Sequence, residues 1–184
     1  MDERGSEERR VKTKIGIIGN GSDKFTPHGA TIAKAVIVEI LMANHKPVLM
    51  SGHSRMGGID IWAEEIATQL GHEKDIKAPK TESWGGDYGY KERNLDIARS
   101  SDYLYVIVAD SYPPDYNGQT FLKDGRQYCY HCNTFNHVKS GACYTRKLFE
   151  KAKSKLGVTV IIPNVGNVVI YKVGDKAHTK NFSE

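Results

Sequence analysis

The chain has 184 residues, of which 39% are hydrophobic and 26% charged, as is typical of one globular domain with a sizeable core. No apolar run approaches the roughly 20 residues of a membrane helix, and the charged first residues contain no hydrophobic segment of a secretory signal. The formal net charge of +4 is too small to indicate nucleic-acid binding by itself. We therefore expect a cytoplasmic protein with no membrane partner, in which residues 1–13 form a charged, flexible tail.

Strands and helices are predicted to alternate along the chain. A short apolar run predicts a buried strand at 14–19, and the spacing of Ile32, Val36 and Ile40 predicts a helix after it. The elements predicted next are a strand at 47–52, a helix at 59–70, a short strand near 75–78, a helix at 91–99, a strand at 102–110, a helix at 140–156, a strand at 158–164 and an edge strand at 168–173. Residues 111–139 have no clear period.

This alternation predicts βαβ units, a mainly parallel sheet and right-handed crossovers. We therefore expect a Rossmann-like three-layer α/β/α sandwich. Its single domain is predicted to cover residues 14–171 and to carry a Cys/His insertion at 111–140, before the last main helix. Residues 172–184 are predicted to form a C-terminal tail.

Three glycine-containing segments, 19–22, 51–60 and 140–145, lie where a predicted helix begins. Glycine lets backbone N–H groups approach an anion, and a helix N-terminus adds unpaired donors and partial positive charge. The segments therefore predict phosphate or nucleotide binding, although neither the P-loop pattern nor G-x-G-x-x-G is present. The candidate ligand-binding residues in them are Gly19, Asn20, Gly21, Ser51, Gly52, Arg55, Gly57, Gly58, Asp60, Ser140, Gly141 and Thr145.

The second segment and the residues after it carry a family resemblance. Residues 51–65, Ser-Gly-His-Ser-Arg-Met-Gly-Gly-Ile-Asp-Ile-Trp-Ala-Glu-Glu, are similar to the SGG-x-R-G-[AI]-D-x-x-A-E signature of the SLOG superfamily. Trp84, Arg93-Asn94 and Ser101-Asp102 resemble the W…RN…[AS]D segment of its YspA or YpsA-related branch, and Ser140 to Thr145 stand at its second glycine loop. The resemblance covers about residues 14–163.

This resemblance implies a Rossmann-like sheet that binds nucleotides or derivatives such as ADP-ribose. Members range from ligand sensors to phosphoribohydrolases that cleave a nucleotide N-glycosidic bond. His53 stands at a family glycine, and residues 140–143 depart from the hydrolases' PGG-x-GT-x-x-E stretch. Arg93 and Asn94 suit a ribose or phosphate clamp, with a solvated helix face as the alternative. Trp62 and Trp84 are expected in the core rather than against a ligand.

Three cysteines and a histidine, Cys129, Cys132, His137 and Cys143, form the pattern C-x2-C-x4-H-x5-C. Thiolate and imidazole are preferred zinc ligands, and four of them complete a tetrahedral structural site. A metal would also explain how a segment of about 29 residues stays ordered. The sequence therefore predicts structural Zn²⁺, with His131 as an alternative to His137. A redox pair and free cysteines are the competing interpretations.

Two classes of function are predicted from these patterns. The first is a module that binds or senses a nucleotide, and the second is a hydrolase or transferase acting on the N-glycosidic or phosphate bond of a nucleotide. Glu92, Asp87 and Asp110 are candidate carboxylates for such chemistry, but no spacing singles one out. Nucleic-acid binding is a third alternative with little support, because few basic residues interleave the cysteines. The sequence leaves a homo-oligomer open.

Overall fold

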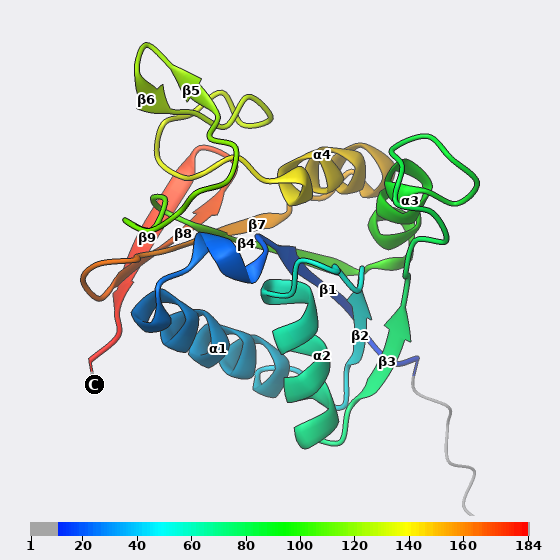
Figure 1. Ribbon diagram of the computed structural model, residues 1–184. Helices are drawn as coiled ribbons and strands as arrows, with labels where there is room; N and C mark the ends of the chain where they lie inside the picture. Colours follow the sequence, from blue (N-terminus) through cyan, green and yellow to red (C-terminus); the bar gives the residue numbers. More distant parts are fainter. Residues whose placement is uncertain (1–10, 184) are drawn as a thin grey trace, which may run out of the picture.

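The computed structural model of the chain describes residues 11–183 (Figure 1). Residues 1–10 of the predicted tail lie outside this part. The elements in chain order are β1 (Lys14–Gly19), a 3₁₀ turn (Ser22–Lys24), α1 (Pro27–Met42), β2 (Val48–Ser51), α2 (Ile59–Gln69), β3 (Glu73–Ile76), α3 (Tyr90–Ser100), β4 (Tyr103–Ala109), β5 (Leu122–Lys123), β6 (Arg126–Gln127), α4 (Gly141–Lys153), β7 (Val158–Ile162), β8 (Val168–Val173) and β9 (Lys176–Asn181). The prediction of an α/β fold with a mainly parallel sheet is confirmed.

A seven-stranded sheet has the order β3-β2-β1-β4-β7-β8-β9. Its first five strands are parallel to one another, whereas β8 and β9 form a hairpin in which β8 pairs antiparallel with β7. The chain runs outward from β1 through β2 to β3 and then returns to place β4 on the other side of β1. The strand order therefore reverses between β1 and β4, which is where open α/β sheets bind their ligands.

Alternate side chains of the central strands enter two separate hydrophobic clusters. Ile17 and Ile107 pack with buried residues of α1 and α2, whereas Ile18 and Val106 pack with buried residues of α3 and α4. This follows from the two-residue period of a strand, which sends successive side chains to opposite faces. Figure 1 accordingly shows α1 and α2 on one side of the sheet and α3 and α4 on the other.

Two segments differ from the expectation. The predicted tail at 172–184 contains β9, which pairs antiparallel with β8, so β9 rather than 168–173 is the edge strand. The insertion contains a hairpin, β5–β6, whose turn residues Asp124 and Gly125 have φ of 54° and 71°. Positive φ at both positions is typical of the type I′ turn that favours Asp-Gly. No helix within residues 11–183 is long and apolar enough to cross a membrane.

Candidate functional site

The glycine loops that follow β1 and β2 are packed against each other. The backbone N–H of Ser22 donates to the carbonyl oxygen of Met56 at 3.2 Å, and that of Ile59 donates to the carbonyl oxygen of Asn20 at 3.1 Å. Gly58 has φ of +75°, and a Cβ added to it would lie 2.4 Å from the oxygen of Asn20. Gly58 is therefore required for close backbone packing, and these N–H groups are already used within the protein.

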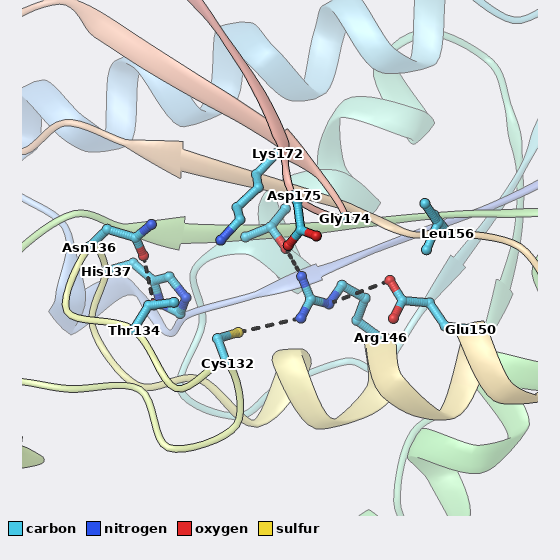
Figure 2. A pocket seen from close by; sticks show the side chains of 11 residues that line it. Cys132, Thr134, Asn136, His137, Arg146, Glu150, Leu156, Lys172, Gly174 and Asp175 are labelled. Carbon is cyan, nitrogen blue, oxygen red and sulfur yellow. Dashed lines mark hydrogen bonds and ion pairs between the residues drawn. The ribbon is translucent and has the colours of Figure 1, made fainter.

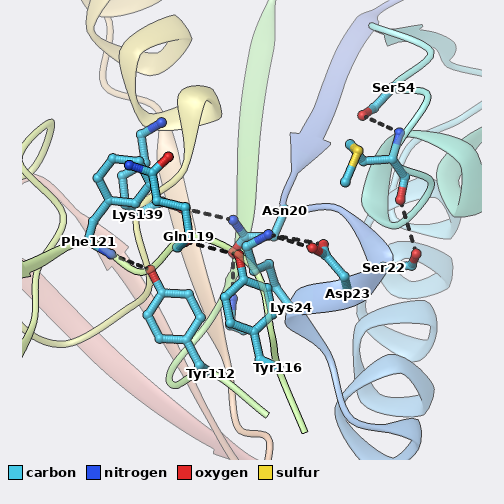
Figure 3. A network of polar contacts seen from close by, with 12 residues as sticks. Asn20, Ser22, Asp23, Lys24, Ser54, Tyr112, Tyr116, Gln119, Phe121 and Lys139 are labelled. Carbon is cyan, nitrogen blue, oxygen red and sulfur yellow. Dashed lines mark hydrogen bonds and ion pairs between the residues drawn. The ribbon is translucent and has the colours of Figure 1, made fainter.

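Asn20 connects the first loop to the insertion (Figure 3). Its side-chain amide donates to the carbonyl oxygen of Lys139 at 3.2 Å, and its Oδ1 accepts from the N–H of Ala109 at 3.0 Å. Only 5% of Asn20 is exposed. This predicted ligand residue thus holds the end of the insertion against the end of β4.

Other predicted residues of the second loop also have partners within the protein. Arg55 forms an ion pair with Glu82 while most of its side chain stays exposed. The Ser51 hydroxyl is buried and donates to the carboxylate of Glu64 at 2.7 Å. The predicted ligand residues that do not line the pocket described next are Asn20, Gly21, Ser51, Gly52, Arg55, Gly57, Gly58 and Ser140.

A pocket of about 230 Å³ lies at the reversal of strand order, where β1 ends. It is bounded by the first turns of α2, α3 and α4. The structure brings six of the predicted residues together in it: Gly19, Asp60, Arg93, Asn94, Gly141 and Thr145. The other lining residues were not among the predicted ligand residues: Ile18, Ser54, Trp84, Tyr90 and Ala142.

Arg93 and Asp60 form a buried charged pair in this pocket. The Arg93 guanidinium donates through Nη1 to the carbonyl oxygen of Gly52 at 2.6 Å and lies 3.8 Å from Asp60 Oδ2. The side chains are 12% and 5% exposed, so Arg93 does not lie on a solvated helix face. Buried Arg93 Nε has no hydrogen-bond partner within residues 11–183. The Nε of Arg146, which does not line this pocket, is likewise buried without a partner among the described residues, so the feature is not particular to the pocket.

Burial also changes the acid–base chemistry of the pair. Desolvation raises the pKa of Asp60 to about 6, although the Arg93 guanidinium and the N–H of Gly19 both favour the carboxylate. Desolvation lowers the pKa of Arg93, and Asp60 opposes this effect. Asp60 is therefore the carboxyl group in the pocket suited to exchanging a proton near neutral pH. The sequence candidates Glu92, Asp87 and Asp110 do not line the pocket.

The third predicted loop forms the far wall of the pocket. The Ser140 hydroxyl caps α4 by accepting from the N–H of Ala142. Gly141 follows at the first helical position, and a Cβ added there would meet no atom within 4 Å. Unlike the first two loops, the start of α4 thus faces open space. Trp84 lies at the pocket with 51% of its surface exposed, so its expected place in the core was wrong.

The four predicted metal ligands, Cys129, Cys132, His137 and Cys143, form one cluster whose donor atoms all lie within 4.8 Å of one another. An ideal zinc tetrahedron, with Zn–S bonds of about 2.3 Å, places its sulfur atoms about 3.8 Å apart, so a small contraction would complete the site. Thiol hydrogen bonds from Cys132 and Cys143 lower the pKa of Cys129 far below its usual value. A thiolate is the form of cysteine that binds metals.

The histidine of the cluster is oriented for metal binding through Nε2. His137 is 2% exposed, and its Nδ1 lies 2.8 Å from the carbonyl oxygen of Val138. Donation to this carbonyl assigns the proton to Nδ1 and leaves Nε2 as the ligand atom. Burial also lowers the pKa of His137, which favours the neutral form that binds metals. His131 is not a member of the cluster, because its ring packs against Tyr130 and Tyr144.

Arg146 lies beside the cluster in a second pocket of about 210 Å³ (Figure 2). Its Nη2 is 3.5 Å from the sulfur of Cys132, and its Nη1 donates to the hydroxyl of Thr159 at 2.8 Å. Three thiolates and one neutral imidazole would leave a bound divalent cation with a net charge of −1. The guanidinium of Arg146 would then compensate this charge from outside the ligand set.

No protein-family model, curated protein or solved structure matches this chain.

Proposed function

We propose that this chain is a Rossmann-like three-layer domain, related to the SLOG superfamily, that binds a nucleotide or an ADP-ribose-like derivative in the pocket between β1 and α4. The observation that carries the proposal is the guanidinium of Arg93, which lies beside Asp60 and lines the pocket at the reversal of strand order. Arg93 would donate to a phosphate or ribose oxygen, and the N–H of Gly141 would add a donor with the partial positive charge of a helix N-terminus. Trp84 would contact the base from the pocket's edge.

Calorimetric titration with AMP and ADP-ribose tests this proposal. We expect both to bind the wild-type protein, and Arg93→Met to weaken them by at least about tenfold, as loss of a charged hydrogen bond requires. Arg99→Met is the matched control, because Arg99 lies on the same helix but is exposed and lines no part of the pocket. Absence of binding heat in the wild type, or equal affinity of both variants, would overturn the proposal.

A second candidate function is hydrolysis or transfer at the glycosidic or phosphate bond of the bound nucleotide. It is supported by Asp60, whose pKa of about 6 suits a general acid or base. Chromatography of incubated nucleotides would then detect released base, sugar or phosphate. Asp60→Asn should abolish turnover while binding persists. Intact nucleotides after prolonged incubation with protein that binds them would assign the pocket to ligand binding alone.

We further propose that Cys129, Cys132, His137 and Cys143 hold one structural Zn²⁺. Four protein ligands complete a tetrahedron and leave no position for a catalytic water, so the metal would stabilise the insertion. Elemental analysis of protein purified without chelator should find about one zinc per chain, and His137→Ala should lose the metal whereas His131→Ala retains it. Metal-free wild-type protein with three freely reactive thiols would contradict this assignment.

A further inference from the structure

A row of five rings, which we call the ring row, crosses the surface from the insertion to the pocket. Neighbouring ring centroids are separated by 5.8 Å from Phe121 to Tyr130, 4.4 Å to His131, 5.9 Å to Tyr144 and 5.2 Å to Trp84. These residues come from the insertion, from α4 and from the segment before α3. The fold therefore joins rings that the sequence separates.

Two rings of the row are exposed, whereas Phe121, His131 and Tyr144 are half-buried, and the row ends at the pocket. Tyr130 is 48% exposed and Trp84 is 51% exposed, and Trp84 also lines the pocket. The pocket, at about 230 Å³, is smaller than the roughly 300–1,000 Å³ that usually enclose a drug-sized ligand. A ligand anchored at Arg93 would consequently continue outside the pocket, along the exposed rings.

Positive charge accompanies the rings. Lys139 Nζ lies 4.6 Å from the ring centroid of Phe121 and 5.5 Å from that of Tyr130, and Figure 3 shows Lys139 beside Phe121. Lys147 is exposed and follows Tyr144 by three residues on α4. Rings that accept bases, with ammonium groups that meet phosphates, are the combination by which proteins bind single strands without reading their sequence.

We infer that the ring row binds the bases of a short single-stranded nucleic acid, one nucleotide of which occupies the pocket. The inference rests on the proposed function, because Arg93 would hold that nucleotide's phosphate or sugar. The inference extends the proposed ligand from a free nucleotide to a single-stranded nucleic acid. The rings of Trp84 and Tyr144 would contact the bases nearest the pocket, and those of Tyr130 and Phe121 the bases farther along.

Three of the five rings of the ring row lie next to predicted metal ligands in the chain. Tyr130 and His131 lie between two of the predicted metal ligands, Cys129 and Cys132, in a turn closed by donation of the Cys132 N–H to the Cys129 carbonyl oxygen at 3.2 Å. Cys143 directly precedes Tyr144 in the first turn of α4. A metal bound by these cysteines would fix the spacing between the insertion rings and the helix ring.

The test is fluorescence anisotropy with a labelled oligothymidylate of about 12 nucleotides, a length within the range that compact single-strand-binding domains cover. We expect Trp84→Ala and Tyr130→Ala each to weaken binding by at least about fivefold, the lower limit for loss of one stacked base. Tyr103→Ala is the matched control. Tyr103 is 45% exposed, and Lys155 Nζ lies 3.4 Å from its ring centroid. Tyr103 begins β4, however, so it lies at the amino ends of the parallel strands, away from the pocket at their carboxyl ends.

Calorimetry with AMP on the same proteins separates this inference from the proposed function. Binding of AMP without binding of the oligonucleotide overturns the ring row and leaves the pocket assigned. Equal effects of Tyr130→Ala and Tyr103→Ala, or equal affinity for a duplex of the same length, also overturn it, since general charge would then explain the binding. Preference for the single strand, reduced by both ring-row variants but not by the control, supports it.

Discussion

The first turns of helix α4 lie between two sites of different kinds, a closed cluster of side chains and an open pocket. On one side Cys143 joins a cluster in which four donor atoms face one another within 4.8 Å. On the other side Gly141 and Thr145 line a pocket that also contains the guanidinium of Arg93. A metal would satisfy all members of the cluster, whereas the start of α4 at Gly141 faces open space.

The first two glycine loops differ from the third in the same way. Around Gly58 the backbone donors of one loop meet the backbone acceptors of the other, so the glycines serve packing. Around Gly141 the helix start is open. A glycine-rich loop thus indicates close approach of some group, and only the structure decides whether that group is a ligand or the protein itself.

Loss of the metal should produce the largest effect. With zinc supplied, Cys129→Ser should lower the free energy of unfolding by several kcal/mol, on the order of 5, because the binding energy of a structural metal is folding energy. Urea unfolding followed by circular dichroism measures this change. His131→Ala, outside the cluster, should cost less than about 1 kcal/mol. If the cysteine variant cannot be purified, EDTA added to the wild type should cause the same loss, and indifference to EDTA would contradict a metal-stabilised insertion.

Substitution of a glycine required for packing should cause the second largest loss of stability. Gly58→Ala combines a positive φ with a Cβ placed 2.4 Å from a backbone oxygen, and we expect it to destabilise the fold by about 3 kcal/mol or more. Gly71→Ala is the control, because its φ of +71° carries the same strain but nothing lies within 4 Å. It should cost only about 1–2 kcal/mol. Equal costs in thermal unfolding would mean that the loops around Gly58 are looser than described.

The buried carboxyl of the pocket should show a smaller, pH-dependent effect. Asp60 has a pKa of about 6 in the folded protein, above its ordinary value of 3.8, so the folded state binds more protons between these two pH values. Stability from this group is present below about pH 4 and is lost as the pH rises through 6, a change of about 2 kcal/mol between pH 4 and 7. Asp60→Asn should remove this part of the pH dependence in urea unfolding. Parallel profiles for both proteins would place Asp60 in a solvated environment.

Much of the fold could be predicted because apolar runs and glycines mark the central strands and their turns. The run at 14–19 and the Ile32, Val36, Ile40 spacing predict elements that the structure contains as β1 and α1. β9 could not be predicted in this way, because its residues, KAHTKN, are all exposed and carry no apolar alternation. The dipeptide Asp124-Gly125 is typical of a hairpin turn and could have predicted β5–β6. It was not used, because the residues around it show no hydrophobic periodicity.

The candidate sites were predictable to different degrees for a physical reason. Metal ligands are close in sequence, so the spacing of Cys129, Cys132, His137 and Cys143 predicts their cluster directly. The pocket joins residues of four separate segments, and the partners of each depend on tertiary packing. Arg55 and Arg93 both looked suited to bind phosphate, yet only Arg93 lies in the pocket, because the turn that carries Arg55 directs it to Glu82 at the surface.

The contrast between open and closed loops can be measured directly by following backbone amide resonances while AMP or ADP-ribose is added. We expect the largest shifts at Gly141, Ala142 and Asn94, which line the pocket, and little change at Ser22 and Gly57, whose N–H groups already donate to protein carbonyls. The largest shifts at Ser22 and Gly57, with Gly141 unchanged, would contradict the account and return the ligand to the first two glycine loops.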